Sequence, residues 1–437
     1  MTPRIPLSAT SERTTAPAIS SLMQMALADP SLISLAAGFV DQASLPVDAA
    51  SRAMGSLSGD AVEARRALQY GTTAGDLSLR RGVLERLERE EGVATGTFAD
   101  ALPRTVVTTG SQQLLYLLAE AILDPGDVVL VESPTYFVFL GLLQSRGARV
   151  LGVETDDQGL KLDALDETFA TLKAEGSLPR VKLVYTVSEH SNPSGISLAA
   201  DRRRPLLELV RRWSTDHRIF ILEDAAYRGL TYDGEEPKSV WGHDREGETV
   251  VLARTFSKTF SPGLKTGYGV LPLPLVEPIL RLKGNHDFGS SNFNQILIDR
   301  LMRDGSYDRQ IQTLQAVYRR KRDVMLGAME EYLGAMAGVS WTHPRGGLYV
   351  WLTLPESVDT GLGSPLFQRC LSEGMLYVPG SYAFADSTGP APTHHIRLCF
   401  GVPGEAELAE GVRRLALALG ESLGASPAEA SRAGSKF

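Results

Sequence analysis

The sequence contains only two cysteines, Cys370 and Cys399, so disulfide bonds cannot form the framework of the fold. No cysteine and histidine spacing suits zinc. The adjacent His394 and His395 would point to opposite faces of a strand and could not share one ion. The sequence therefore predicts no metal site. So few thiols fit a reducing compartment, and we expect the chain in the cytoplasm.

Long apolar runs are also missing. No stretch approaches the roughly 20 uninterrupted apolar residues that span a membrane. Residues 1–17, MTPRIPLSATSERTTAP, lack the apolar core of a secretory signal, although their serine, threonine and arginine content leaves a transit peptide as an alternative. We therefore expect no membrane partner.

Positive charge is scarce as well. The 437 residues carry 44 lysines and arginines against 52 acidic residues, for a net charge of −8, so nucleic acid is not expected as a partner. One basic cluster, DRRRPLLELVRRW (201–213), places arginines around apolar residues at helical spacing and predicts a solvated helix face. Only nine of the 44 basic residues are lysines, yet Lys258 and Lys265 both lie in ARTFSKTFSPGLKTGYG (253–269).

The sequence does contain a regular alternation of strand-like and helix-like segments. Nearly continuous Val/Ile/Leu strands that alternate with helices predict a parallel sheet covered on both faces. The expected strands are 105–109, 127–133, 148–154, 181–187, 219–225 and 248–255, and the expected helices are 111–123, 136–147, 162–176 and 203–217.

After about residue 275 the pattern changes to a smaller α+β arrangement. A long helical region at 295–335 is followed by short strands within 338–354, 375–384 and 394–401, and by a helix at 405–423. Residues 1–18 are expected to form an extended arm. We expect four parts: arm and part of the small domain (1–50), large domain (51–310), small C-terminal domain (311–423) and disordered tail (424–437).

Polar residues stand where the expected strands end. Asn192 lies in HSNPSG after the strand at 181–187, Asp224 closes IFILED, and Lys258 follows the strand at 248–255. Each has an ordinary explanation when taken alone: a turn, a helix cap and an exposed lysine. Ser111 and Gln112 open a helix, where backbone N–H groups favour an anion, although an ordinary N-cap is the simpler interpretation. Because parallel strands end at one edge of a sheet, these groups are expected to meet.

Such a set suits pyridoxal phosphate. The aldehyde of this cofactor needs a lysine for a Schiff base, and its pyridine nitrogen needs a carboxylate to stay protonated. Its phenolic oxygen needs hydrogen-bond donors, and its phosphate needs N–H groups, hydroxyls and a cation.

An ordered series of motifs resembles one family. The series is YGTTAGDLSLR, TTGSQQLL, ESPTY, SNPSG, EDAAYRGLTY, RTFSKTFSPGLKTGYG, RGGLYVW and IRLCFG. Over roughly residues 20–420 the chain resembles the fold-type I pyridoxal-phosphate aminotransferases of the aspartate aminotransferase superfamily, and within them the α-aminoadipate/kynurenine aminotransferase branch. The resemblance implies an α/β fold with a large, mostly parallel sheet domain and a smaller α+β domain. It also implies a homodimer that moves amino groups between amino acids and 2-oxo acids by ping-pong kinetics.

The resemblance also assigns roles by position. Lys258 would form the Schiff base and move the Cα proton, and Asp224 would hold the pyridinium N–H. Asn192 and Tyr227 would bind the phenolic oxygen, and Tyr136 would stack on the ring. The residues expected to hold the phosphate are Ser111, Gln112, Thr255, Ser257 and Lys265, with Tyr70 from the partner subunit.

The substrate is expected to lie against a different set. Arg397 would grip the α-carboxylate in a bidentate fork, with Asn192 and the backbone of Gly38 beside it. Phe288 and Tyr349, together with the stacking tyrosine, are expected to supply apolar lining.

The chain departs from the family pattern around the rim of the cofactor. Lys265 stands where the family has arginine, and HSNPSG replaces QNPxG. Ser20 and Ser21 stand near a position where the branch often carries arginine, which puts recognition of acidic side chains in doubt. His190 is either a turn residue or a substrate or proton-transfer contact.

Two alternatives to transamination remain open at this point. The quinonoid intermediate that such enzymes form could lead instead to elimination, replacement or carbon–carbon bond formation in a specialised pathway. A transcription regulator with an aminotransferase-like domain is a third class, but the arm of about 20 residues has no room for a helix-turn-helix.

Overall fold

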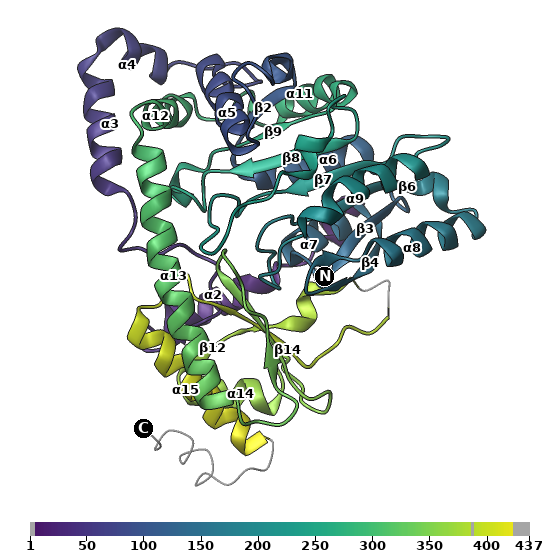
Figure 1. Ribbon diagram of the computed structural model, residues 1–437, viewed down its shortest axis with the longest axis vertical. Coiled ribbons are helices and arrows are strands. Elements are labelled where there is room, and N and C mark those ends of the chain that lie inside the picture. Colours follow the sequence, from purple (N-terminus) through teal and green to yellow (C-terminus); the bar gives the residue numbers. More distant parts are fainter. Residues whose placement is uncertain (1–4, 386–388, 423–437) are drawn as a thin grey trace.

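The computed structural model describes residues 5–385 and 389–422, arranged as a large sheet wrapped by helices and a smaller α+β part beside it (Figure 1). The tail expected at 424–437 lies outside the described residues. No helix in the described ranges is long and apolar enough to cross a membrane.

The large sheet has eight strands in the order β2-β9-β8-β7-β6-β3-β4-β5. Strands β8, β7, β6, β3 and β4 run parallel, whereas β9 is antiparallel to both of its neighbours and β5 is antiparallel to β4. The strands are β2 (Thr105–Thr108), β3 (Val128–Ser133), β4 (Arg149–Asp156), β5 (Gly159–Leu160), β6 (Val181–Thr186), β7 (Phe220–Asp224), β8 (Val250–Thr255) and β9 (Gly267–Val270). The predicted fold class is confirmed.

Helices cover both faces of this sheet because its strands are apolar on both sides. Val129 and Val131 of β3 pack into one core cluster, whereas Val128 and Leu130 pack into another. Helices α6 (Gly110–Ile122) and α7 (Phe137–Arg146) contribute to the first cluster. The second cluster includes residues of α5 (Leu77–Glu90), α8 (Leu162–Ala174), α9 (Ala200–Trp213), α10 (Val240–His243) and α12 (Asn292–Arg303).

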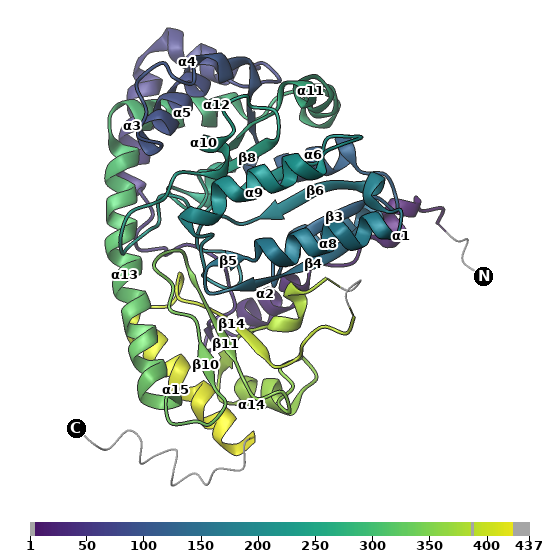
Figure 2. The same cartoon turned by 45° about the vertical axis from the view of Figure 1, so that its right-hand side comes forward.

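The smaller part is built on a four-stranded antiparallel sheet in the order β10-β11-β14-β13. The long helix α13 (Ser306–Leu333) runs from the large sheet to this part, where it packs against α15 (Glu405–Ser422) (Figure 2). The strands are β10 (Ser340–Trp341), β11 (Tyr349–Thr353), β13 (Val378–Pro379) and β14 (His395–Cys399), and α14 (Pro365–Ser372) lies between β11 and β13 in the chain.

The start of the described chain is tied to this smaller part. Strand β1 (Ile33–Ser34) pairs in parallel with β12 (Met375–Leu376). Leu35 N–H then donates to the carbonyl of Leu376, and Cys399 N–H donates to the carbonyl of Leu35. These bonds place residues 36–38 beside β14. The remaining elements are α1 (Ala9–Arg13), α2 (Ala18–Ala28), α3 (Val47–Gly59), α4 (Ala61–Leu68), α11 (Leu273–Asp287) and the 3₁₀ turns η1 (Ala99–Arg104), η2 (Leu178–Arg180), η3 (Pro262–Leu264) and η4 (Gly380–Ala383).

Three local expectations differ from the structure. The arm expected to be extended contains the short helix α1, capped by the Ser8 side chain. The helical region expected at 295–335 is two helices, because Gly305 adopts a left-handed φ of +75° between α12 and α13. The helix face expected to be solvated at 201–213 is not wholly exposed, since the side chain of Arg203 is completely buried.

Candidate active site

The carboxyl ends of β6, β7 and β8 place three predicted residues at one edge of the sheet. Asp224 is the last residue of β7, Lys258 follows β8 after one short turn, and Asn192 lies in the loop after β6. Adjacent parallel strands end side by side, so their following loops share this edge.

Asp224 is a buried carboxylate with one oxygen engaged and one free. Tyr185 of the neighbouring strand β6 donates its hydroxyl to Oδ2 at 3.0 Å. Oδ1 has no hydrogen-bond partner among the described residues. Burial raises the pKa of Asp224 to about 6, since the charged form is poorly solvated. Sequence reasoning missed Tyr185 because it lies in an apolar strand; the register of β6 against β7 was the missing information.

Lys258 directs its amine toward the segment tied to the small sheet. Nζ donates to the carbonyl oxygen of Gly38 at 2.7 Å. Burial lowers the pKa of Lys258 to about 8, and the charges of Arg397 and Lys265 act in the same direction. An amine that is partly neutral near physiological pH is a better nucleophile than an ordinary lysine.

Arg397 projects from β14 into the same region and is almost fully buried. Its guanidinium donates to Asn192 Oδ1 at 2.9 Å and to the carbonyl of Ala36 at 2.6 Å. Its Nε has no hydrogen-bond partner among the described residues. The guanidinium carbon lies 4.6 Å from the ring centre of Tyr349 and 5.2 Å from that of Phe137. A buried planar cation with a free N–H is suited to bind a carboxylate.

Tyrosines surround this cation. Tyr227 donates its hydroxyl to that of Tyr349 at 3.1 Å, and their rings meet edge to face. A Cβ added at Gly38 would lie 2.5 Å from the Tyr349 hydroxyl, so only glycine fits this approach. Tyr136, at the N-cap of α7, lies near Asp224 and Tyr349, and burial first and then these two neighbours raise its pKa well above its usual value.

Hydroxyls and backbone amides gather at the next strand end. Thr255 donates its hydroxyl to Ser257 at 3.0 Å. Gly267 pairs with Thr255 across β8 and β9, and a Cβ at Gly267 would lie 2.7 Å from Ser111 N, so the first turn of α6 reaches this strand end. The expected serine cap is wrong: Thr109 is the N-cap of α6, and the amide of Ser111 lies in its first turn. The side chain of Gln112 is exposed.

Three further predicted residues, Lys265, Tyr70 and Phe288, lie on the surface. Lys265 is exposed and adopts a left-handed φ of +45° at the end of η3. The side chain of Tyr70 is 82% exposed, and its ring meets Phe288 edge to face at 5.7 Å. The structure thus brings most of the predicted residues together but leaves these side chains and that of Gln112 outside the buried cluster, and Phe288, 63% exposed, does not line the site as expected.

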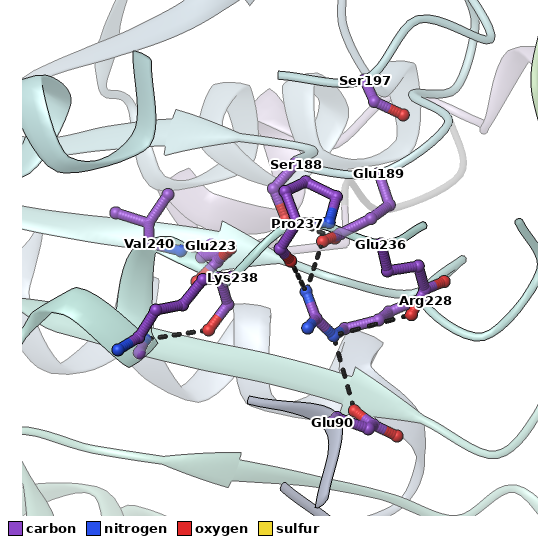
Figure 3. Close-up of polar contacts among 12 residues, drawn as sticks. Glu90, Ser188, Glu189, Ser197, Glu223, Arg228, Glu236, Pro237, Lys238 and Val240 are labelled. Atoms are coloured by element: carbon purple, nitrogen blue, oxygen red, sulfur yellow. Dashed lines mark hydrogen bonds and ion pairs between the residues drawn. The ribbon is translucent and has the colours of Figure 1, made fainter. Parts of the chain in front are cut away.

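A buried cluster of ions supports the loops that carry Tyr227 and Asn192 (Figure 3). Arg228, next to Tyr227, donates at 2.8 Å to Glu189, which also accepts from Arg203 at 2.8 Å. Figure 3 also shows Arg228 facing two further carboxylates, Glu90 and Glu236. Glu90 and Glu189 are both far from Arg228 in the sequence, so the local pattern gave no signal of this cluster.

His190 lies at the edge of this loop with both ring nitrogens engaged. One nitrogen lies 2.8 Å from the hydroxyl of Thr231 and the other 3.2 Å from that of Ser197. Burial lowers its pKa to about 4, which keeps the ring neutral. A Cβ at Gly346 would collide with this ring, and a Cβ at Gly347 would collide with the Cβ of His190. These contacts favour the interpretation of His190 as a turn residue that packs against the small part.

A cavity of about 900 Å³ lies over the outer face of α7. Residues 14–17, Tyr116, Phe137 and Phe384 contribute to its walls, and it borders the cluster at Phe137. Within the described ranges, no group of three or more His, Cys, Asp or Glu side chains is placed to hold a metal ion.

Comparison with known proteins gives a consistent result. The family described as "Aminotransferase class I and II" matches residues 30–415. The chain is 32% identical over 394 residues to aromatic-amino-acid aminotransferase 1 of Thermococcus litoralis, covering 90% of this chain and 89% of that protein. It is 31% identical over 393 residues to 2-aminoadipate transaminase of Thermus thermophilus, covering 89% and 90%. The crystal structure of Pyrococcus horikoshii kynurenine aminotransferase, in complex with PMP, superimposes with a TM-score of 0.86 at 31% identity, covering 95% of this chain and 97% of that one.

Proposed function

The chain belongs to the class I and II aminotransferases, and we propose that Lys258 is the amine through which it holds pyridoxal 5′-phosphate and moves the substrate proton. As a member of this family it transfers amino groups between amino acids and 2-oxo acids with this cofactor. The observation that carries the proposal is the free, buried Oδ1 of Asp224 at the strand edge from which Lys258 also projects.

The residues present fit the cofactor. An unpartnered carboxylate oxygen in a buried site is costly unless a donor fills it, and a pyridinium N–H is such a donor. Tyr185 holds the other oxygen of Asp224 and fixes the direction of the carboxylate. In this proposal the hydroxyl of Tyr227 and the amide of Asn192 donate to the phenolic oxygen, and the ring of Tyr136 stacks on the cofactor.

The proposed phosphate site uses the adjacent strand end. Ser111, Thr255 and Ser257 supply a helix N-terminal amide and two hydroxyls, which suit an anion. Gln112 and Lys265, whose side chains are exposed, complete the set from the solvent side.

When bound, pyridoxal 5′-phosphate supplies an aldehyde that condenses with amines and a ring that accepts the electron pair left by the Cα–H bond. The protein contributes the acid–base steps. Nζ of Lys258 would take the proton from the substrate Cα and return it to the cofactor carbon on the other side of the substrate nitrogen, and its lowered pKa suits both directions. Asp224 keeps the ring nitrogen protonated, and Arg397 orients the substrate through its α-carboxylate.

Substrates with apolar or aromatic side chains fit the site best. Arg397 is committed to the α-carboxylate, and the neighbouring side chains are Phe137, Tyr136 and Tyr349. Ser20 and Ser21 bring no positive charge from α2 for a second carboxylate. The relatives named for aromatic amino acids and kynurenine support the same preference.

We also propose a homodimer in which Tyr70 reaches the phosphate of the partner subunit. Leu68, Tyr70 and Phe288 are 79%, 82% and 63% exposed, an unusual concentration of large apolar side chains on a free surface. A second copy that covers them would bring Tyr70 to another site.

We further propose two domains, 51–310 and 311–423, with the first 50 residues shared between an arm and the small domain. Helix α13 begins just before residue 311 and joins them. We propose the cytoplasm as the compartment, because Cys370 and Cys399 are both free, buried thiols.

Absorbance of the purified enzyme, wild type and Lys258→Ala, tests the assignment. The wild-type cofactor band should survive gel filtration, and Phe, Tyr, Leu and kynurenine should each shift it and yield one oxo acid per site. Lys258→Ala should lose the covalent band and turnover. Turnover by Lys258→Ala at the wild-type rate would refute the role of Lys258. A preference for Asp, Glu or 2-aminoadipate would refute the proposed substrate class.

A further inference from the structure

Tyr349 was expected only to supply apolar lining, but its hydroxyl lies at the centre of the site. Tyr349 belongs to β11, is 1% exposed and stacks beside Arg397. Its oxygen accepts the Tyr227 proton at 3.1 Å and lies 2.5 Å from where a Cβ at Gly38 would stand, and the Gly38 carbonyl accepts from Lys258. The hydroxyl therefore contacts two segments that carry the proposed chemistry.

The two phenols have only two protons to donate. A phenol carries one O–H and can accept as well. In the structure Tyr227 gives its proton to Tyr349. Within residues 5–385 and 389–422, the hydroxyl of Tyr349 accepts this bond and donates to no other group, so its own proton is uncommitted. The proposed function requires Tyr227 to donate to the phenolic oxygen of the cofactor, which it cannot do while donating to Tyr349.

We propose that Tyr349 is a positioning residue that reverses this hydrogen bond when the cofactor is bound. Its O–H then donates to the Tyr227 oxygen, and the Tyr227 proton turns to the phenolic oxygen of the cofactor. This inference rests on the proposed role of Tyr227. Hydrogen bonds in such a chain polarise one another, so the second donor strengthens the first.

The reversal needs only a small adjustment of the pair. The edge-to-face packing, with centroids 5.7 Å apart and planes at 85°, keeps the two hydroxyls in contact while that of Tyr349 turns from acceptor to donor. The charged and titratable groups that face the pair include Arg397 and Cys399 on β14, Tyr136 at the start of α7 and Tyr318 on α13.

The test is a pH titration of the absorbance of the cofactor bound to Lys258. Hydrogen-bond donors to the phenolic oxygen stabilise its negative charge and thereby lower the pKa of the nitrogen in the lysine linkage. Tyr349→Phe removes one oxygen and keeps the ring. It should move the titration midpoint upward by about half a pH unit, less than Tyr227→Phe does. In the Tyr227→Phe background, Tyr349→Phe should add no further shift.

Tyr377→Phe is the matched control. Tyr377 is also buried in the small part, and its hydroxyl donates to the carbonyl of Thr360 away from the site. It should lower the melting temperature and leave the titration unchanged. A fluorotyrosine at position 349 is a stronger hydrogen-bond donor and should move the midpoint downward. This second test can be made even if Tyr349→Phe does not fold.

The outcomes separate the two levels of the argument. If Tyr227→Phe leaves the midpoint unchanged, the proposed role of Tyr227 fails, and this inference fails with it. If Tyr227→Phe shifts the midpoint, the role of Tyr227 stands. The inference about Tyr349 is then overturned if Tyr349→Phe leaves the midpoint unchanged, or if it shifts the midpoint equally in the wild-type and Tyr227→Phe backgrounds.

Discussion

Lys258 Nζ lies 2.7 Å from the carbonyl oxygen of Gly38, a residue 220 positions earlier in the chain. Gly38 follows the segment that pairs with β12 and β14, so the small sheet places a carbonyl directly on the amine at the end of β8. The position of the small part is thereby coupled to the reactive group of the large sheet.

The contact between Gly38 and Tyr349 leads to a prediction. A Cβ at position 38 would lie 2.5 Å from the Tyr349 hydroxyl but 3.5 Å from the ring carbon that bears it. Gly38→Ala should therefore displace the segment, lowering kcat/KM about tenfold or more, as overpacking costs about 1–3 kcal/mol. Tyr349→Phe removes the clashing oxygen, so Gly38→Ala should cost much less in that background. Steady-state kinetics of the four proteins measure this, and equal losses in both backgrounds would disprove the clash.

The buried amine predicts a pH dependence of stability in the cofactor-free protein. Burial lowers the pKa of Lys258 to about 8 from its ordinary value of 10.5. Between these two pH values the unfolded chain binds more protons than the folded one, so the free energy of unfolding rises with pH. Relative to that of Lys258→Met, the free energy of unfolding of the wild type should rise by about 2 kcal/mol between pH 8 and pH 10, allowing for the partial solvent access of the amine.

Urea unfolding at several pH values checks this expectation. Lys173→Met, at an exposed position of α8, controls for the loss of one lysine. A constant difference between wild type and Lys258→Met across this range would show that the amine is not desolvated.

The Glu189 cluster predicts a large effect at a distance from the chemistry. Glu189 accepts from both Arg203 and Arg228 at 2.8 Å, and all three side chains are buried. Glu189→Gln should cost about 3–5 kcal/mol of unfolding free energy, because two buried guanidinium groups lose their shared counter-charge. The two arginines hold the pKa of Glu189 well below its usual range, so its contribution is present above about pH 4.5 and fades in acid.

Glu208→Gln is the matched control for that measurement. Glu208 pairs with Arg204 on the same helix at the same 2.8 Å, but both side chains are more than half exposed. Its loss should cost less than about 1 kcal/mol. Similar melting temperatures for the two variants would show that burial does not govern the strength of this cluster.

The sequence predicts the strand-end residues well and their partners poorly. Asp224, Lys258 and Asn192 could be placed because adjacent parallel strands end at one edge, whatever their exact register. Tyr185 could not, because its contact with Asp224 depends on how β6 aligns with β7. Arg397 was found only through its motif, since no periodicity connects β14 with the large sheet.

Other misses have similar causes. Strand β9 was not predicted, because Gly267 and Gly269 weaken a strand pattern. They are needed there because a Cβ at either would collide with α6 or with the facing strand. Arg203 was predicted to be solvated because arginines on a helix usually are. Its counter-ion Glu189 lies outside that helix, in the loop after β6, so the helix pattern alone did not reveal the ion pair.

The exposed Tyr70 gives a test of the proposed dimer. The structure leaves this side chain 82% exposed, with its ring edge to face against Phe288, so a role in catalysis requires another subunit. Tyr70→Ala and Lys258→Ala should each have little activity alone. Hybrid dimers would contain one complete site, with Lys258 from one subunit and Tyr70 from the other. Random mixing should therefore restore about a quarter of wild-type activity. If Tyr70 served its own subunit, every site in the mixture would lack one residue, and co-refolding the two variants would restore nothing.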